Sequence, residues 1–204
     1  TIIGTPTQAG VFYYTVTTIG PCVQTASTGT LTINGNAILT LATGSGPKSQ
    51  TICLGTALVP IAFVVSGSGT GATATGLPPG VSGSFSNGTF TISGTPILAG
   101  TFNYTVTTTG PCLQAFETGT IKVNPNITIS LTSGAGSNIQ TRCIDSAITN
   151  ITYAIGTGGT GATVTGLPTG VTGNFASGVF TISGTPTQSG TFAYVVQPVG
   201  PCNL

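Results

Sequence analysis

Residues 101–108 of the chain read TFNYTVTT, and this stretch decides the class of fold. Its apolar residues, Phe102, Tyr104 and Val106, occupy every second position and alternate with polar residues. Successive side chains of a β-strand point to opposite faces, so the alternation predicts a strand with one buried and one exposed face. Turn residues separate it from further strand signals at 38–43, 49–54, 60–65 and 88–92. Short strands spaced this closely predict a small antiparallel β-sandwich.

The composition supports strands and argues against helices. The chain of 204 residues has 32 Gly, no Met, and only five charged side chains, three basic and two acidic. The residues that most favour helices are therefore scarce, whereas β-branched and aromatic residues pack well on a pleated surface. Disordered chains are charged and poor in apolar residues, which does not describe this one. We expect an all-β, folded chain.

The low charge also excludes several classes of function. Three dispersed cations cannot form the basic surface that binds nucleic acid, and no apolar run approaches the roughly 20 residues of a membrane-spanning helix. Without His, no Ser-His or Cys-His catalytic pair is possible. The only acids, Glu117 and Asp145, are too few and too scattered for a glycosidase pair or a calcium site. We therefore predict no enzymatic activity, no cofactor and no metal site.

The cysteines reveal a repeat of 90 residues. Their separations alternate between 31 and 59, so each cysteine recurs after 90 residues, at positions 22, 53, 112, 143 and 202. The motif Gly-Pro-Cys ends at three of them, 22, 112 and 202, and TISGTP occurs at 91–96 and again at 181–186. The chain aligns on itself without a gap, which is the pattern of a tandem array rather than of one domain.

The period divides the chain into three parts. Residues 1–34 are predicted to be the C-terminal part of one module, 35–125 a complete module, and 126–204 a module that lacks its last strand. Because the modules are cut out of register, we expect the 204 residues to be an ordered stretch of a longer, polymer-like protein. The predicted fold class is all-β, with tandem antiparallel β-sandwich modules.

Three motifs carry a resemblance to a known family. LPPGV at 77–81, the SGTP of residues 93–96 and GTFNYTV at 100–106 resemble the Ig-like repeats of giant bacterial cell-surface adhesins. With the added cysteines and Thr-rich strands, the chain is similar to the gliding-motility adhesins of flavobacteria and related Bacteroidetes. The resemblance implies an Ig-like fold, export by the type IX secretion system, and a place in an adhesin stalk attached to the outer membrane.

The cysteines allow two pairings. One joins Cys53 to Cys112 and Cys143 to Cys202, which leaves Cys22 for a partner outside these 204 residues. The other joins Cys22 to Cys53 and Cys112 to Cys143, across module boundaries. Because a module must be closed before its neighbour exists, we predict the first pairing. A bridge closing about 60 residues would contribute about 4 kcal/mol, and disulfides imply an oxidising, extracytoplasmic compartment.

One short motif indicates a modification. Asp145-Ser146-Ala147 resembles the acidic-serine-small signal that Bacteroidetes use for O-glycosylation of exported proteins. A chance match is the alternative. We keep Ser146 as a candidate glycosylation site.

The sequence thus predicts a structural role: a stalk of a secreted, cell-surface adhesin or filament, stiffened by one disulfide per module. The alternative is a glycan-binding Ig-like module of a secreted surface protein. The expected partners are neighbouring repeats of the same chain, further copies of the chain, other surface proteins and, in the alternative, glycans. Because the near-zero net charge provides little repulsion between chains, self-association is expected.

Overall fold

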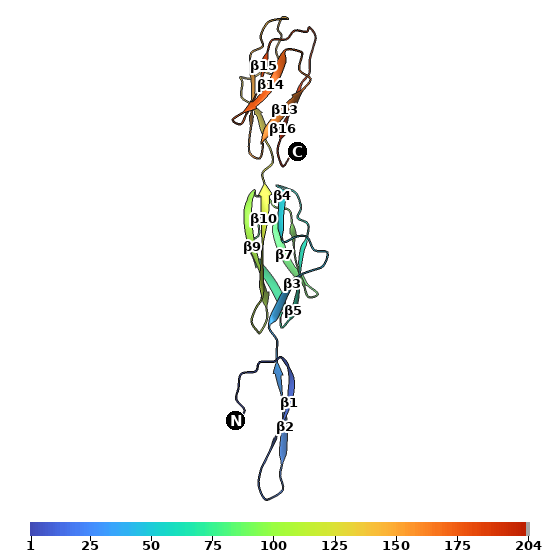
Figure 1. The fold of residues 1–204 in the computed structure, drawn as a ribbon, viewed down its shortest axis with the longest axis vertical. Coiled ribbons are helices and arrows are strands. Elements are labelled where there is room, and N and C mark those ends of the chain that lie inside the picture. Colours follow the sequence, from blue (N-terminus) through green and yellow to red (C-terminus); the bar gives the residue numbers. More distant parts are fainter. Residues whose placement is uncertain (203–204) are drawn as a thin grey trace. The chain divides into compact units, whose positions relative to one another are not determined.

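The structure of the protein is a computed structural model, and it describes residues 1–202. Within those residues every regular element is a β-strand (Figure 1). The strands are, in chain order, β1 (Gly10–Thr17), β2 (Ala26–Ile33), β3 (Ala37–Leu41), β4 (Ser49–Cys53), β5 (Ile61–Gly67), β6 (Gly71–Thr75), β7 (Val81–Ser86), β8 (Thr89–Gly94), β9 (Gly100–Thr109), β10 (Phe116–Asn124), β11 (Ile129–Leu131), β12 (Ile151–Ile155), β13 (Gly161–Thr165), β14 (Val171–Ala176), β15 (Val179–Gly184) and β16 (Val195–Val199).

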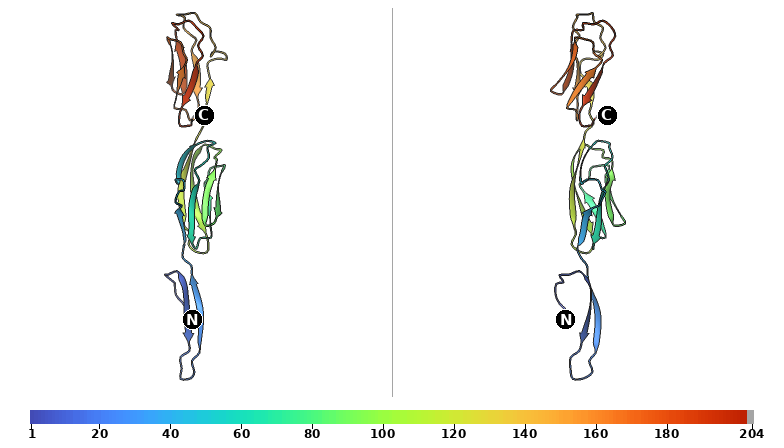
Figure 2. Two further views of the ribbon diagram at one scale, coloured as in Figure 1. Left: turned by 90° about the vertical axis from the view of Figure 1, so that its right-hand side faces the viewer. Right: turned by 45° about the vertical axis from the view of Figure 1, so that its right-hand side comes forward.

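Strands β3 to β10 form a sandwich of two four-stranded sheets. The strand orders are β3-β5-β8-β7 in one sheet and β4-β10-β9-β6 in the other, and Figure 2 shows the two layers from two further sides. The alternation predicted for residues 101–108 is confirmed, because Tyr104 and Val106 are only 1% and 0% exposed. Both sheets supply the core, through Ile61, Phe63, Phe90, Ile92, Tyr104, Val106, Ile121 and Val123. Each fully buried Val or Ile side chain stabilises the fold by about 1.5–3 kcal/mol.

The LPPG and SGTP motifs lie against each other. Thr95 donates a backbone hydrogen bond to the carbonyl of Gly80 at 3.1 Å. Gly94 has φ 135°, and a Cβ atom at this position would collide with the same carbonyl, so the approach requires glycine. The same contact recurs one repeat later, between Thr185, Gly184 and Gly170. The two motifs therefore form one backbone junction in each copy.

Strands β1 and β2 form an antiparallel hairpin that is the repeat equivalent of β9 and β10. Its apolar face is exposed: Phe12 and Tyr14 are both 42% exposed, whereas Tyr104, the repeat equivalent of Tyr14, is 1% exposed. The part of the chain that the structure describes supplies no second sheet for this hairpin. Among the described residues, the hairpin is held by its backbone pairing and by the hydrogen bonds of the Thr18 side chain with Thr25.

The region from β11 onward repeats the pairing of the sandwich before it. Its sheets are β11-β12-β15-β14 and β13-β16. The pair Ile151↔Ile182 between β12 and β15 is the repeat equivalent of the pair Ile61↔Ile92 between β5 and β8. The core of this region consists of Ile127, Ile151, Ile155, Val171, Phe180 and Ile182.

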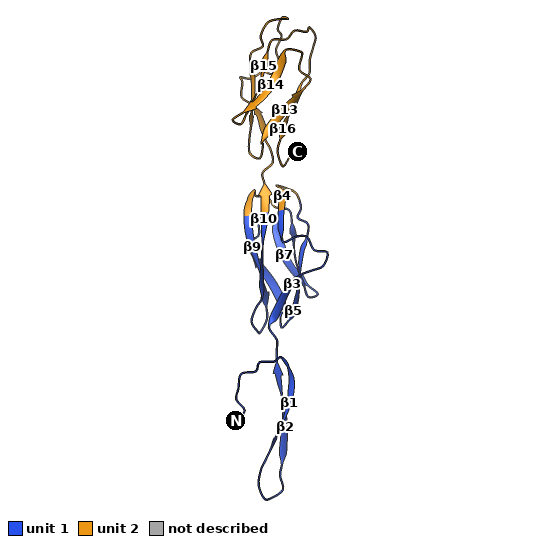
Figure 3. Cartoon of the chain, viewed as in Figure 1, with its two compact units in different colours: residues 1–50, 57–95, 102–121 blue, residues 51–56, 96–101, 122–204 orange. Residues whose placement is uncertain are grey.

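The chain divides into two compact units (Figure 3). Unit 1 comprises Thr1–Gln50, Ala57–Thr95 and Phe102–Ile121, and unit 2 comprises Thr51–Thr56, Pro96–Thr101 and Lys122–Leu204. The predicted module limits of 1–34, 35–125 and 126–204 follow the sequence period, and they remain a prediction.

A buried glutamine fixes the loop between β4 and β5. Gln50 is 8% exposed, and its side-chain amide donates to the carbonyls of Pro47 at 3.3 Å and Val59 at 2.7 Å. Its Oε1 accepts a hydrogen bond from the Val59 backbone at 3.1 Å. Gln140 makes the same set of bonds with Ser137 and Thr149, but it is more exposed.

We expect Gln50→Ala to lower the free energy of unfolding by about 1–3 kcal/mol, because three shielded hydrogen bonds are lost. Urea denaturation followed by circular dichroism measures the change. Gln140→Ala is the matched control, and its effect should be smaller because water can replace the lost bonds. An equal or larger loss for Gln140→Ala would contradict this explanation.

Candidate functional site

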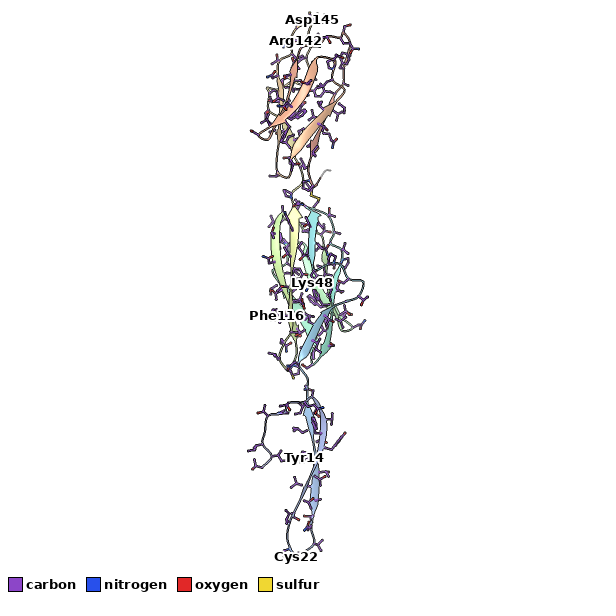
Figure 4. The ribbon with its side chains drawn as sticks, viewed as in Figure 1. Tyr14, Cys22, Lys48, Phe116, Arg142 and Asp145 are labelled. Carbon is purple, nitrogen blue, oxygen red and sulfur yellow. A yellow bond between two sulfur atoms is a disulfide. The ribbon has the colours of Figure 1, made fainter. Side chains whose placement is uncertain are left out.

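One disulfide joins cysteines of two successive repeats. Cys53, at the end of β4, is bonded to Cys202, with their Cα atoms 5.6 Å apart and a sequence separation of 149. Both cysteines belong to unit 2. Cys22, Cys112 and Cys143 are free thiols; Cys22 is labelled in Figure 4 in the loop between β1 and β2.

This pairing corrects the predicted one. The structure does not form the bridges Cys53–Cys112 and Cys143–Cys202, nor the alternative bridges Cys22–Cys53 and Cys112–Cys143. The prediction assumed that each module is closed by its own disulfide. The sandwich of β3 to β10 is instead stabilised by its packed core. Its two cysteines, Cys53 and Cys112, lie at opposite ends of the strands.

The direction of β4 relative to β10 explains why Cys53 and Cys112 stay apart. Lys48, just before β4, lies beside Glu117 near the start of β10, and the Leu54 N–H after β4 donates to the carbonyl of Asn124 at the end of β10. The two strands therefore run in the same direction. Cys53 lies where β10 ends, whereas Cys112 precedes its start. A strand of 9 residues rises about 30 Å, and a disulfide needs Cα atoms within about 7 Å.

The other predicted pair is separated in the same way. Asp145, two residues after Cys143, donates its N–H to the carbonyl of Pro186, which follows the end of β15. The carbonyl of Cys202 accepts the N–H of Ile127, which precedes the start of β11, and β11 and β15 both run antiparallel to β12. The two cysteines therefore lie at opposite ends of this sheet. Cys143 is consequently exposed and unpaired.

A tight turn positions Cys53. The Thr56 N–H donates to the carbonyl of Cys53 at 3.0 Å, and the Gly55 N–H donates to the carbonyl of Pro96 at 3.1 Å. Gly55 has φ 80°, a left-handed conformation that glycine adopts without strain. The turn after Cys53 is thus anchored on the proline of the SGTP motif.

The carbonyl of Asn124 organises the other side of the bridge. It accepts the Leu54 N–H at 2.9 Å and lies 3.9 Å from the Sγ of Cys202. The Ile127 N–H donates to the carbonyl of Cys202 at 3.4 Å, and Cys202 is only 2% exposed. Backbone hydrogen bonds at the end of β10 and just before β11 therefore flank the disulfide and hold it in place.

The charged residues do not form a site. Lys48 and Glu117 make an ion pair of 2.7 Å, with side chains 42% and 34% exposed, and such exposed pairs contribute about 0–1 kcal/mol. Asp145 belongs to unit 2, whereas Glu117 belongs to unit 1. Among residues 1–202, no group of three or more His, Cys, Asp or Glu side chains could hold a metal ion.

Two tyrosine hydroxyls titrate abnormally. Burial raises the pKa of Tyr104 to about 12, and the Glu117 carboxylate adds to the rise. The Tyr104 hydroxyl donates to the carbonyl of Lys48 at 2.9 Å. Burial also raises the pKa of Tyr194, and its hydrogen bond with the Tyr153 hydroxyl at 3.0 Å raises it further. Both groups are therefore held in the neutral form.

The candidate glycosylation residue lies in an accessible turn. Ser146 is exposed, and its N–H donates to the carbonyl of Cys143 at 3.2 Å. Asp145 occupies the position of Gly55 and adopts the same left-handed backbone, with φ 61°. Modification of Ser146 remains a prediction.

Two shallow hollows open on the surface of the described residues. One lies beside β13 and β14 and is lined by Leu167, Val171 and Phe180. A second lies on the exposed apolar face of the β1–β2 hairpin, beside Phe12 and Leu31. Neither hollow contains a charged side chain.

Solved structures with a similar fold include tandem domains of titin. The I-band fragment I67–I69 has a TM-score of 0.52 at 12% identity, over 79% of this chain. The three-Ig structure of an E-to-A mutated variant of I67–I69 has a TM-score of 0.52 at 12% identity, over 80% of this chain. This chain covers 65% of the length of each fragment. The fold is a tandem Ig-like β-sandwich.

The likeness to titin, at 12% identity, shows the fold alone. An endo-fucoidan hydrolase of glycoside hydrolase family 107 is similar over 97% of this chain, but its TM-score of 0.34 is too low to carry an argument. No protein-family model matches the chain, and no curated protein matches it. Residues 1–202 contain no helix long and apolar enough to cross a membrane.

We expect a non-reducing peptide digest to yield Cys53 linked to Cys202, with Cys22, Cys112 and Cys143 alkylated before reduction. Cys202→Ser should lower the free energy of unfolding by up to about 5 kcal/mol, because the bridge closes a long loop. Cys143→Ser removes a free thiol and should leave stability unchanged. Recovery of a Cys53–Cys112 peptide would refute the assignment.

We expect stability to fall as the pH rises above 10. The folded pKa of Tyr104 is about 12, above the unfolded value of about 10. Its contribution is therefore complete below pH 10 and is lost as the pH rises toward 12. Urea midpoints between pH 8 and pH 11.5, with free thiols blocked, should decline less in Tyr104→Phe than in the unsubstituted chain. Tyr13→Phe, at a position 83% exposed, is the control and should keep the full decline.

Proposed function

We propose that this chain is a structural segment of a secreted, cell-surface adhesin or filament, in which successive Ig-like repeats are locked together by disulfides. The observation that carries the proposal is the Cys53–Cys202 bridge, which joins two repeats. The bridge joins the turn after β4 to a residue that follows β16. It therefore adds a covalent path between successive repeats.

The proposed location rests on the same bridge and on the sequence motifs. Disulfides persist in oxidising compartments outside the cytoplasm, which supports export. The LPPG, SGTP and GTFNYTV motifs resemble those of outer-membrane-attached gliding adhesins, which supports a cell-surface stalk and the type IX export route. The proposed role is mechanical, and it needs no catalytic residue or cofactor. Its partners would be neighbouring repeats, further copies of the chain and other surface proteins.

The bridge would determine how the chain responds to tension. A force applied to the two ends passes from residue 53 through the disulfide to residue 202, so the residues between them carry no load. Since each extended residue spans about 3.3–3.6 Å, the protected segment of the 149-residue loop represents about 500 Å of hidden length. A stalk built in this way would extend little under load.

In single-molecule pulling from both termini, we expect the oxidised chain to release only the residues outside the loop. Reduction should add about 500 Å of contour length, because residues 54–201 then become extensible. Cys143→Ser should behave like the unsubstituted chain, and Cys202→Ser should show the full extension without reductant. Equal extension of the oxidised and reduced chains would overturn the proposed function.

A further inference from the structure

The five cysteines belong to two structural kinds. Cys53 and Cys143 precede the turn that docks on the SGTP motif, and we call them turn cysteines. Cys22, Cys112 and Cys202 end a Gly-Pro-Cys sequence, and we call them loop cysteines. The disulfide of the structure joins a turn cysteine to the loop cysteine that follows 149 residues later.

The free turn cysteine is held as the bonded one is. The Ser146 N–H donates to the carbonyl of Cys143 at 3.2 Å, as the Thr56 N–H does to Cys53 at 3.0 Å. The Asp145 N–H donates to the carbonyl of Pro186 at 2.9 Å, which repeats the bond from Gly55 to Pro96. The turn at Cys143 therefore has the same backbone hydrogen bonds as the turn at the bonded Cys53, but the thiol of Cys143 is exposed.

The free loop cysteine Cys112 also lies in a formed half-site. Its Sγ lies 3.7 Å from the carbonyl of Asn34, and one repeat later the Sγ of Cys202 lies 3.9 Å from the carbonyl of Asn124. The side-chain amide of Gln114 holds the loop by donating to the carbonyls of Gly110 and Cys112. The thiol is thus already placed beside the end of the preceding strand, β2.

One component of the bonded site has no counterpart at Cys112. At the bonded site, the residue after the turn cysteine, Leu54, donates its N–H to the carbonyl of Asn124. Among the described residues, no backbone N–H donates to the carbonyl of Asn34 in this way. A turn cysteine followed by a residue that donates its backbone N–H would complete the site. The repeat carries such a segment.

We propose that Cys112 and Cys143 are the two halves of the same inter-repeat disulfide. Wherever the repeat continues, each bonds its partner at the same separation of 149 residues that the Cys53–Cys202 bridge has. Cys112 bonds the turn cysteine before it, and Cys143 bonds the loop cysteine after it. This inference rests on the proposed function. Each bridge forms by thiol–disulfide exchange: two thiols lose their protons and together two electrons, a disulfide oxidant such as oxidised glutathione accepts them, and it leaves as two thiols.

Two lengthened chains test the two half-sites separately. In the first, a second copy of residues 115–204 follows Leu204, which keeps the repeat period and adds a loop cysteine after Cys143 at the separation of the Cys53–Cys202 bridge. In the second, a second copy of residues 1–90 precedes Thr1, which adds a turn cysteine before Cys112 at that same separation. Each chain is refolded with oxidised glutathione, its free thiols are counted, and its bridges are mapped without reduction.

We expect three free thiols in each lengthened chain, as in the 204-residue chain, although each has gained two cysteines. Peptide mapping should link Cys143 to the added copy of Cys202 in the first chain, and Cys112 to the added copy of Cys53 in the second. As a control, Cys143→Ser in the first chain should leave the added copy of Cys202 unpaired and keep the Cys53–Cys202 bridge.

Five free thiols in both lengthened chains, with Cys53–Cys202 intact, would overturn the inference and leave the proposed function standing. A bridge from Cys143 to Cys202 or to Cys112 would also overturn it. Absence of the Cys53–Cys202 bridge from the original chain would overturn the proposed function itself. The original chain therefore separates the two failures.

Discussion

The sandwich depends on burial of the apolar face of the β9–β10 hairpin by the sheet opposite. The molecule contains its own comparison, because the β1–β2 hairpin has a related sequence and the same antiparallel pairing. Tyr104 is 1% exposed in the covered hairpin, and Tyr14 is 42% exposed in the uncovered one. Backbone pairing is common to both hairpins, so the difference between a hairpin and a sandwich comes from the removal of apolar surface from water.

Much of the fold could be predicted from the sequence because strand alternation and the repeat are local, countable features. The alternation at 101–108 predicted the inward face of β9. The repeat also appears in the strand pairing, because Ile61 pairs with Ile92 and their repeat equivalents, Ile151 and Ile182, pair in the same way. Some elements differ between copies. The alternating residues at 191–194 lie outside β16, which begins at Val195, and no strand corresponds to β4 in the later copy among the described residues. Alternation shows which face a strand buries, but not whether a neighbour is present to pair with it.

The disulfide could not be predicted in the same way. Cysteine spacing measures distance along the chain, whereas a bridge depends on which strand ends meet. The strand at 49–53 was expected, but its running in the same direction as β10 follows from long-range contacts such as Lys48 with Glu117. That direction places Cys53 and Cys112 at opposite ends of one sheet. The signal that was present in the sequence is the repeated Gly-Pro-Cys loop, which marks one half of the bridge but not its partner.

The Cys53–Cys202 bond also changes what a break in the backbone would do. Nearly three-quarters of the chain lies between its two cysteines, including all of the strands from β5 to β16. A protease that cuts any one exposed loop in that interval leaves two fragments still joined through sulfur. The packed sheets on each side of the cut keep their neighbours, so a single cleavage divides the polypeptide without separating its parts. The bridge therefore makes the chain tolerant of a single break in its backbone between residues 53 and 202.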